Sequence, residues 1–511
     1  MQLAGDVLCV GLPAATLDAA TARELTEIAP GAVLLFARNV ATEAQVRMLV
    51  AGARAAIGGD APALACVDQE GGRVARLQFL EPGVPSMLAL GATDDAELAR
   101  RVGARHAADC ARVGANVDFA PVLDLALAPR STVIGTRSLG DDPGGVAALG
   151  AALVRGIEGG GIASVPKHFP GHGATALDSH VTLPTIATPA AALRARDLVP
   201  FVAAFAAGAS AVMTAHAIVS AFDAELPATL SHRVLTGLLR DELGFAGVCF
   251  TDCLEMDAIA RSVGTAHGAV LALAAGADCC TISHRLALAR EARDAIVAAV
   301  GDGTLPRARL EEAAARVRSL RARFAPTAER SDTPPETVAI ASLVAARAVA
   351  RLSGDVRLDP ALPVTVVSFE GISSDGIAQH GGERPSLSLA LRRRKFRSEL
   401  LRVPLEPDAE MGAMLLDLLA AQGDRNIVVM TRRAHLYPGQ RDLIAGVVAR
   451  FAHTVGVSAL EPFDAAGLAC ARGVACTFDD NDAAIDALAD VLAGRAEATG
   501  RVPVALATTR A

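Results

Sequence analysis

The chain has 511 residues, a hydrophobic fraction of 52% and a formal net charge of −8 at pH 7, so it is long enough for two domains that each bury a core. The negative charge gives no general attraction to nucleic acid. With no Trp, one Tyr and 15 Phe, the chain also lacks the aromatic platforms that grip single-stranded nucleic acid or long oligosaccharides.

Eight short apolar segments alternate with amphipathic, helix-like segments over residues 1–325. Continuous apolar strands are typical of parallel sheets that helices cover on both faces, and eight such units predict a (β/α)8 barrel of the TIM type. The expected strands are Val7–Val10, Ala32–Phe36, Ala63–Val67, Ala115–Phe119, Ile162–Val165, Ala211–Ala215, Val248–Thr251 and Ala277–Ile282.

The only long stretch without Asp, Glu, Lys or Arg is Leu198–Phe222, which is long enough to span a bilayer. Because Pro200, Gly208 and His216 interrupt it, we interpret it as a helix (Phe201–Ala207) followed by the sixth strand, and we expect no membrane segment. The nine cysteines have no disulfide-framework spacing and the N-terminus has no basic leader, which favours a cytoplasmic protein.

A Pro-rich polar segment at 326–336 predicts a linker, with a barrel domain over 1–325 and a C-terminal domain over 337–511. The second part predicts a smaller α/β sandwich or doubly wound domain, for which we expect no catalytic role. Its expected strands are Val364–Phe369, Ile427–Thr431, Val455–Ala459 and Val474–Phe478, and its expected helices lie near Val338–Arg351, Met411–Ala421, Arg441–Phe451 and Asp482–Ala493.

Polar side chains follow the predicted strands of the barrel, where the active residues of such barrels lie. They are Asp68, Asp118, Asp124, Lys167, His168, His216, Asp252 and His284. The densest cluster is the segment from Lys167 to His180, Lys-His-Phe-Pro-Gly-His-Gly-Ala-Thr-Ala-Leu-Asp-Ser-His. Only two of the 48 lysine and arginine residues are lysines, so Lys167 indicates a site that needs a compact ammonium group.

The residue types in these segments suit acid–base chemistry. Asp178 stands two residues before His180, so its carboxylate can orient the imidazole as a general acid and base. Asp252 can act as a nucleophile, a general base, a metal ligand or a helix N-cap. Arg76 and Arg137 offer planar donors for hydroxyl or carbonyl oxygens.

The segment from Lys167 to His180 resembles the signature of family 3 glycoside hydrolases of the β-N-acetylhexosaminidase type. The resemblance extends over essentially all of residues 1–325, through the segments Val67–Val74, Asn116–Asp124, Ile134–Ser138, Met213–His216, Pro227–Ser231 and Thr251–Met256. Ala174 departs from the resemblance, because many members carry Asp there. Cys253, directly after Asp252, stands at a position that varies within the family.

The resemblance implies a retaining exo-β-N-acetylglucosaminidase that acts on small amino-sugar glycosides such as cell-wall muropeptide fragments. It implies that Asp252 is the nucleophile and that His180, paired with Asp178, is the acid/base residue. It further implies a sugar-binding set for the hydroxyls and the acetamido group, and no metal or organic cofactor. That set is Asp68, Arg76, Arg137, Lys167 and His168.

Four alternatives remain open at this point. On the same fold, the enzyme could be a β-glucosidase or β-xylosidase, or a GlcNAc phosphorylase, since a neutral base admits anionic acceptors. A metal-dependent barrel hydrolase would use His168, His172, His180 and Asp252 as ligands, but the first strand lacks the expected His-x-His. A non-catalytic sugar-binding protein is the fourth. The oligomeric state is not predicted.

Overall fold

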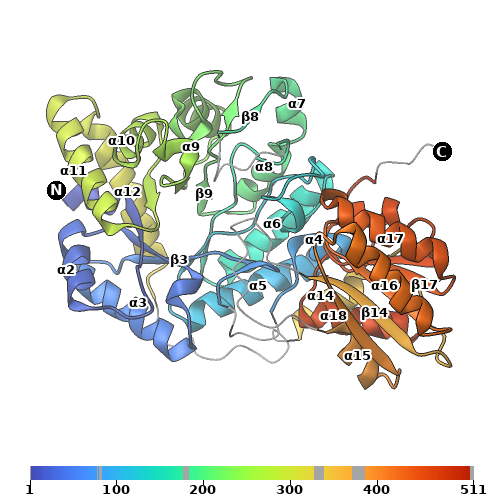
Figure 1. The fold of residues 1–511 in the computed structure, drawn as a ribbon. Coiled ribbons are helices and arrows are strands. Elements are labelled where there is room, and N and C mark those ends of the chain that lie inside the picture. The colour runs from blue at the N-terminus through green and yellow to red at the C-terminus, as the bar shows by residue number, and fades with distance from the viewer. Residues whose placement is uncertain are drawn as a thin grey trace.

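In the computed structural model, eight parallel strands form a nearly closed barrel (Figure 1). The structure describes residues 2–77, 79, 83–175, 183–326, 339–370 and 386–506. The strands are β1 (Leu8–Gly11), β2 (Ala32–Leu35), β3 (Leu64–Val67), β6 (Val117–Asp118), β7 (Ala163–Ser164), β9 (Ala211–Met213), β11 (Val248–Cys253) and β12 (Cys279–Ile282). Each of the eight predicted strands is confirmed, and their order around the barrel follows the chain.

The barrel closes between β7 and β9 through the segment that follows β7. The amide of Phe169 donates a hydrogen bond to the carbonyl oxygen of Met213 at 2.8 Å, and the amide of Ala215 donates to the oxygen of Phe169 at 2.8 Å. The Phe169 ring, fully buried, packs edge to face on Phe201 at 5.5 Å. The beginning of the polar segment that the sequence singles out, at Lys167–Phe169, therefore lies at the seam of the barrel.

Helices surround the sheet, and capping side chains fix where several of them begin. The Asp18, Asp95 and Asp142 carboxylates each accept a hydrogen bond from the amide three residues on. The main helices are α1 (Gln2–Asp6), α2 (Ala19–Ile28), α3 (Glu43–Ile57), α4 (Met87–Thr93), α5 (Ala96–Arg112), α6 (Pro143–Gly159), α7 (Ala190–Ala195), α8 (Val199–Ala206), α9 (Asp257–Ala260), α10 (Thr265–Ala275), α11 (Leu286–Asp302), α12 (Arg307–Arg323) and the π-helix η4 (Arg233–Glu242).

Buried apolar side chains fill the barrel interior. Cys9, Cys66 and Cys279 lie there with larger residues such as Phe119 and Phe250, and Leu320 of α12 and Phe324, just after α12, belong to the same cluster. All nine cysteines are unpaired. The stretch Leu198–Phe222 contains α8 and β9, as predicted, and no helix in the described ranges has the length and apolar character needed to cross a bilayer.

The C-terminal part is a six-stranded sheet between two pairs of helices. Its order is β13-β18-β17-β16-β14-β15, with only β13 antiparallel to its neighbour among the described strands. Helices α15 and α18 cover one face and α16 and α17 the other. The elements are β13 (Ala350–Gly354), β14 (Val364–Glu370), β15 (Ser398–Pro404), β16 (Asn426–Thr431), β17 (Thr454–Ser458), β18 (Gly473–Cys476), α14 (Ile340–Ala348), α15 (Leu387–Arg393), α16 (Ala409–Ala421), α17 (Pro438–Arg450), α18 (Asp482–Leu492), η5 (Ala434–Leu436) and η6 (Pro462–Leu468).

The predicted linker at 326–336 lies outside the described residues except for Pro326. Strands β13 and β15 and helix α15 were not predicted, and the helix expected over Val338–Arg351 ends at Ala348 because the chain enters β13 at Ala350.

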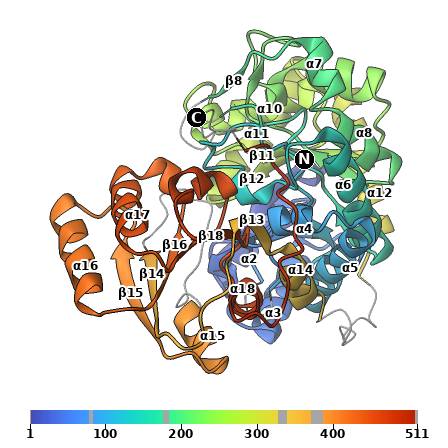
Figure 2. The same cartoon turned by 90° about the vertical axis from the view of Figure 1, so that its right-hand side faces the viewer.

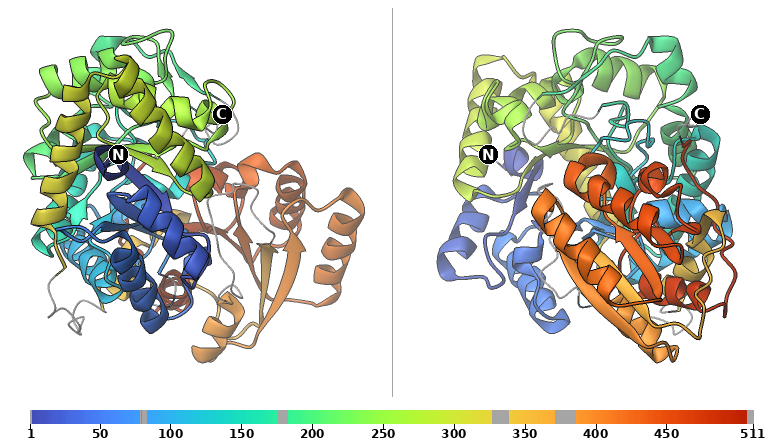
Figure 3. Two further views of the ribbon diagram at one scale, coloured as in Figure 1. Left: turned by 90° about the vertical axis from the view of Figure 1, so that its left-hand side faces the viewer. Right: turned by 45° about the vertical axis from the view of Figure 1, so that its right-hand side comes forward.

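The second domain lies directly beside the barrel (Figures 2 and 3). Ile340 and Val344 of α14 pack into the apolar cluster formed by α4, α5 and α6, and Phe478 and Val504 join Leu88 of α4 in another. The Ser86 hydroxyl donates a hydrogen bond to the Phe478 carbonyl oxygen at 2.6 Å. The two domains therefore share buried apolar surface.

Candidate active site

A cavity of about 260 Å³ opens at the carboxyl ends of the barrel strands. Among the described residues, every side chain that lines it comes from the barrel. Six residues of the expected catalytic and sugar-binding sets meet there: Asp68, Arg76, Arg137, Lys167, His168 and Asp252. His284, expected at the end of the eighth strand, lines the cavity as well. Asp178 and His180 lie outside the described residues.

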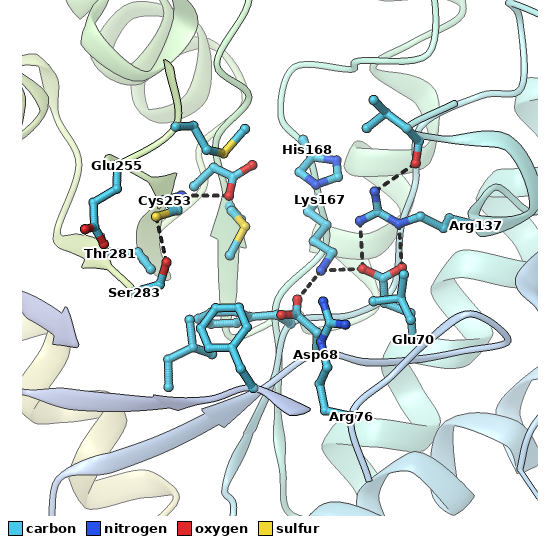
Figure 4. A pocket seen from close by; sticks show the side chains of 18 of the residues that line it. Asp68, Glu70, Arg76, Arg137, Lys167, His168, Cys253, Glu255, Thr281 and Ser283 are labelled. Carbon is cyan, nitrogen blue, oxygen red and sulfur yellow. Dashed lines mark hydrogen bonds and ion pairs between the residues drawn. The ribbon is translucent and has the colours of Figure 1, made fainter. Parts of the chain in front are cut away.

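Lys167 joins two carboxylates on one wall of the cavity (Figure 4). Its Nζ lies 2.6 Å from Asp68 Oδ1 and 2.6 Å from Glu70 Oε1. The lysine side chain is 2% exposed. Burial lowers the pKa of Lys167, but Asp68 and Glu70 outweigh it and raise the pKa above its usual value, so the ammonium stays charged. A compact ammonium is what this position accommodates.

Arg137 forms a bidentate ion pair with the same Glu70. The distances are 2.7 Å from Nε to Oε2 and 2.8 Å from Nη2 to Oε1. Although burial raises the pKa of Glu70, the charges of Arg137 and Lys167 hold it well below its usual range. Asp68, Glu70, Lys167 and Arg137 thus form a neutral four-residue network, which is how a buried charge avoids a large desolvation cost. Figure 4 shows this network on one wall of the cavity.

Asp124 orients two histidines, His168 and His172, that also line the cavity. Its Oδ2 lies 2.6 Å from His168 Nδ1, and its Oδ1 accepts a hydrogen bond from the His172 amide at 2.6 Å. The pKa of Asp124 is lowered despite burial, chiefly by the charge of His168. Because Nδ1 is engaged, Nε2 of His168 is the ring nitrogen left for a ligand. His172 also lines the cavity, and burial lowers its pKa to about 4, so its ring is neutral at pH 7.

The opposite wall is built from β11 and β12. Asp252 Oδ1 accepts a hydrogen bond from the Cys253 amide at 2.7 Å. The Cys253 Sγ lies 2.7 Å from Ser283 Oγ, and burial raises the pKa of Cys253 to about 11, so the group is a thiol at neutral pH. Figure 4 shows Cys253 and Ser283 across the cavity from Lys167 and Asp68.

Two of the residues predicted at strand ends do not line the cavity but form buried hydrogen bonds to backbone groups next to it. His216 is fully buried, and its Nε2 donates a hydrogen bond to the carbonyl oxygen of Cys253 at 2.9 Å. Asp118, also fully buried, accepts a hydrogen bond from the Gln69 amide at 3.1 Å. His216 holds the backbone of Cys253, which lines the cavity, and Asp118 holds the backbone of Gln69, which stands between the lining residues Asp68 and Glu70.

Glu70 is the main residue that the sequence reasoning missed. It lies in the short hairpin of β4 (Gln69–Gly71) and β5 (Val74–Ala75), beyond the end of β3, so a search for polar residues at strand ends stops at Asp68. The available signal was the alternation Asp-Gln-Glu, because residues two apart in an extended segment point to the same face. Glu255, which also lines the cavity and accepts hydrogen bonds from the His284 amide and Arg285, carried no such signal.

The described part of the chain contains no group of three or more His, Cys, Asp or Glu side chains that could hold a metal ion. The Asp252 carboxylate lines the cavity together with the ion-paired network and the histidines described above.

Comparison with known proteins gives the family. A model of the glycosyl hydrolase family 3 N-terminal domain matches residues 6–320. The chain is 39% identical over 285 residues to a beta-hexosaminidase of Xylella fastidiosa, over 54% of this chain and 83% of the relative. It is 45% identical over 250 residues to one of Pseudomonas aeruginosa, over 48% and 73%.

The fold of the whole chain also has a solved counterpart. A family 3 beta-N-acetylglucosaminidase from Paenibacillus sp. str. FPU-7 superimposes with a TM-score of 0.92 at 33% identity, over 99% of this chain and 98% of that one. A beta-glucoside phosphorylase shares the fold at 20% identity and a TM-score of 0.82. The chain belongs to glycosyl hydrolase family 3, and the protein is a glycoside hydrolase.

Proposed function

We propose that the protein is a retaining exo-β-N-acetylglucosaminidase. The observation that carries the proposal is that Asp252 and the Asp68–Glu70–Lys167–Arg137 network line the same cavity. The relatives named beta-hexosaminidase and the similar beta-N-acetylglucosaminidase support the choice of an amino sugar.

In the first step, a carboxylate oxygen of Asp252 attacks the anomeric carbon, and the bond to the leaving oxygen breaks. His180, protonated and oriented by Asp178, gives its proton to that oxygen, so that the leaving group departs as a neutral alcohol. In the second step, the neutral His180 removes a proton from water, which attacks the anomeric carbon and releases Asp252. Two inversions give net retention.

The fixed charges of the cavity suit sugar recognition. Asp68, His168 and Arg76 offer acceptors and donors for hydroxyl groups. The ion pairs of Lys167 and Arg137 with Glu70 keep the Lys167 and Arg137 side chains in place before substrate arrives. We propose cell-wall fragments with a terminal N-acetylglucosamine as substrates, and the cytoplasm as the compartment, which the nine unpaired cysteines favour.

A panel of nitrophenyl β-glycosides of GlcNAc, GalNAc, glucose and xylose, assayed with and without inorganic phosphate, tests the activity. We expect GlcNAc to be released fastest, with retained configuration by NMR. Faster cleavage of the glucoside or xyloside would overturn the substrate assignment, and glycosyl phosphate as the main product would replace hydrolysis by phosphorolysis.

The nucleophile is tested with Asp252→Ala, for which we expect kcat to fall by about 10³ or more. A 5-fluoro N-acetylglucosaminyl fluoride, which keeps the acetamido group, should label the wild-type enzyme, and peptide mapping should locate the label at Asp252. Asp257→Asn is a matched control, because Asp257 lines the same cavity; it should retain most activity and still be labelled.

The acid role of His180 is tested by varying the leaving group. His180→Ala should slow alkyl and sugar glycosides far more than dinitrophenyl glycosides, because a good leaving group needs no proton. Equal losses on both classes of substrate would rule out the acid role.

A further inference from the structure

The side chains that fix one wall of the cavity stand on two loops outside the barrel strands. Glu70 lies in the β4–β5 hairpin, and Arg137 is the last residue of the 3₁₀ turn η2 (Gly135–Arg137). Val74 and Val133, from the same two loops, pack together and also line the cavity. Something other than the sheet must therefore hold these loops in place.

The second domain supplies a buried ion pair behind η2. Arg433 Nη2 lies 3.0 Å from Glu461 Oε1, and Arg433 Nε lies 3.2 Å from each carboxylate oxygen. The side chains are only 6% and 4% exposed. Glu461 immediately precedes the turn η6, and Arg433 precedes η5 in a left-handed conformation (φ 54°), so both are set by local backbone of this domain.

The Glu461 carboxylate presses directly against Gly135. A Cβ atom placed on Gly135 would lie 2.3 Å from Glu461 Oε1 and 3.3 Å from Arg433 Nη2, and the φ of Gly135 is +46°. Only glycine allows this approach without displacing one of the partners. The η2 turn, which carries Arg137, thus packs against the Arg433–Glu461 ion pair of the second domain.

The Glu461 carboxylate also interacts electrostatically with the β4–β5 hairpin. Burial raises the pKa of Glu461, but the charges of Arg433 and then of Arg73, in the hairpin, outweigh it and lower the pKa to about 2. Arg73 in turn donates a hydrogen bond from Nη2 to the carbonyl oxygen of Thr132 at 2.8 Å. A third contact joins His435 Nε2 to the carbonyl oxygen of Pro129 at 3.1 Å.

We propose that Glu461 is a positioning residue for the active site: with Arg433, it holds the η2 turn and the β4–β5 hairpin so that Arg137 and Glu70 form the wall of the sugar pocket. The inference rests on the proposed sugar-binding role of that pocket. It gives the second domain a part in substrate binding although, among the described residues, none of its side chains lines the cavity.

The kinetic test uses Glu461→Gln, which keeps the size of the side chain and removes its charge. We expect KM for the best nitrophenyl glycoside to rise about tenfold and kcat to change less than threefold, because the wall contributes to binding more than to bond cleavage. Asp490→Asn is the control: it removes a charge that Arg394 contacts at 2.7 and 2.8 Å between α15 and α18 of the same domain, and KM should stay within twofold. An unchanged KM in Glu461→Gln would overturn the inference.

A double-mutant cycle separates positioning from general damage. Gly135→Ala should raise KM strongly in the wild type but much less in the Glu461→Ala background, where the clashing oxygen is gone; the backbone strain at Gly135 is common to both. Strictly additive effects would contradict direct coupling.

Hydrogen exchange provides a readout that does not depend on activity. Glu461→Gln should speed amide exchange in peptides covering 69–76 and 129–137, with the barrel strands unchanged.

Two outcomes separate this inference from the proposed function. If the wild-type enzyme cleaves no glycoside but these peptides respond, the proposed function fails and the positioning role stands. If the enzyme cleaves glycosides but the peptides do not respond, the positioning role fails and the proposed function stands. Should Glu461→Gln not fold, Arg73→Gln removes from the barrel side the charge that acts on Glu461 and should give the same exchange pattern.

Discussion

At the scale of single residues, the cavity is organised by the shape of its cations. Lys167 makes two contacts of 2.6 Å to different carboxylates, whereas Arg137 makes two contacts to one. A tetrahedral ammonium can point its donors at two separate acids, and a planar guanidinium matches a single carboxylate. The two residues are therefore not interchangeable.

Lys167→Arg should lower kcat/KM by about 10²-fold, since a guanidinium at this fully enclosed position would displace Asp68, Glu70 or Arg137. Lys395→Arg changes the chain's other lysine, which is exposed, and should leave kcat/KM unchanged. Steady-state kinetics on the nitrophenyl GlcNAc glycoside compares the two; a fully active Lys167→Arg would refute the argument from shape.

The sequence predicted this lysine but not its second partner. Lys167 stood out because lysine is rare in the chain, and Asp68 because it follows an apolar strand. Glu70 is reached only through a hairpin whose geometry depends on contacts with Ser86 and Pro85 in the following segment, and such tertiary contacts leave no periodic pattern in a sequence.

At the scale of elements, helix α5 carries polar groups into the barrel wall. His106 is 1% exposed, and its Nδ1 lies 3.6 Å from Asp118 Oδ2. Burial, and then the charge of Arg105, lowers the pKa of His106 to about 3. The folded protein therefore keeps this ring neutral at a pH where the unfolded chain protonates it.

The stability of the wild type should fall on acidification relative to His106→Asn. Between pH 6.5 and about 3 only the unfolded chain binds this proton, so each pH unit below 6.5 costs up to about 1.4 kcal/mol, or about 2 kcal/mol at pH 5. Above pH 7 this contribution of His106 to the free energy of unfolding disappears. Urea unfolding of both proteins at pH 7.5 and 5 measures the difference in stability; a difference that does not change with pH would refute the neutral ring.

The two strands of the second domain that the sequence did not predict share a physical cause. The strands of the barrel are buried on both faces and are apolar throughout, so all eight were found. In contrast, β13 (Ala-Arg-Leu-Ser-Gly) and β15 (Ser-Glu-Leu-Leu-Arg-Val-Pro) are edge strands with one partner each. Edge strands carry charges that discourage further pairing, and those charges hide them from a search for apolar runs.

At the scale of the whole molecule, the two domains are held together by a shared core. Phe478 is fully buried and packs with Leu88, Ala89 and Val504, and α14 inserts into the cluster of α4, α5 and α6. Such a contact couples the unfolding of the domains, because separating them exposes apolar surface.

Phe478→Ala should destabilise the protein by about 3–5 kcal/mol and weaken this coupling. In scanning calorimetry we expect one transition for the wild type and two resolved transitions for the variant. Phe396→Ala, within the core of the second domain, is the control: it should lower the transition temperature without splitting the peak. A single peak in Phe478→Ala would show that this contact does not join the domains.

The seam between β7 and β9 has a consequence for ligand binding. Backbone from Pro166 to Phe169 both completes the cylinder and presents Lys167 and His168 to the cavity. A sugar that engages those two side chains also restrains the hydrogen bonds that keep the wall shut. We therefore expect ligand binding to stabilise the closed barrel, because opening this seam would displace the two side chains that hold the sugar.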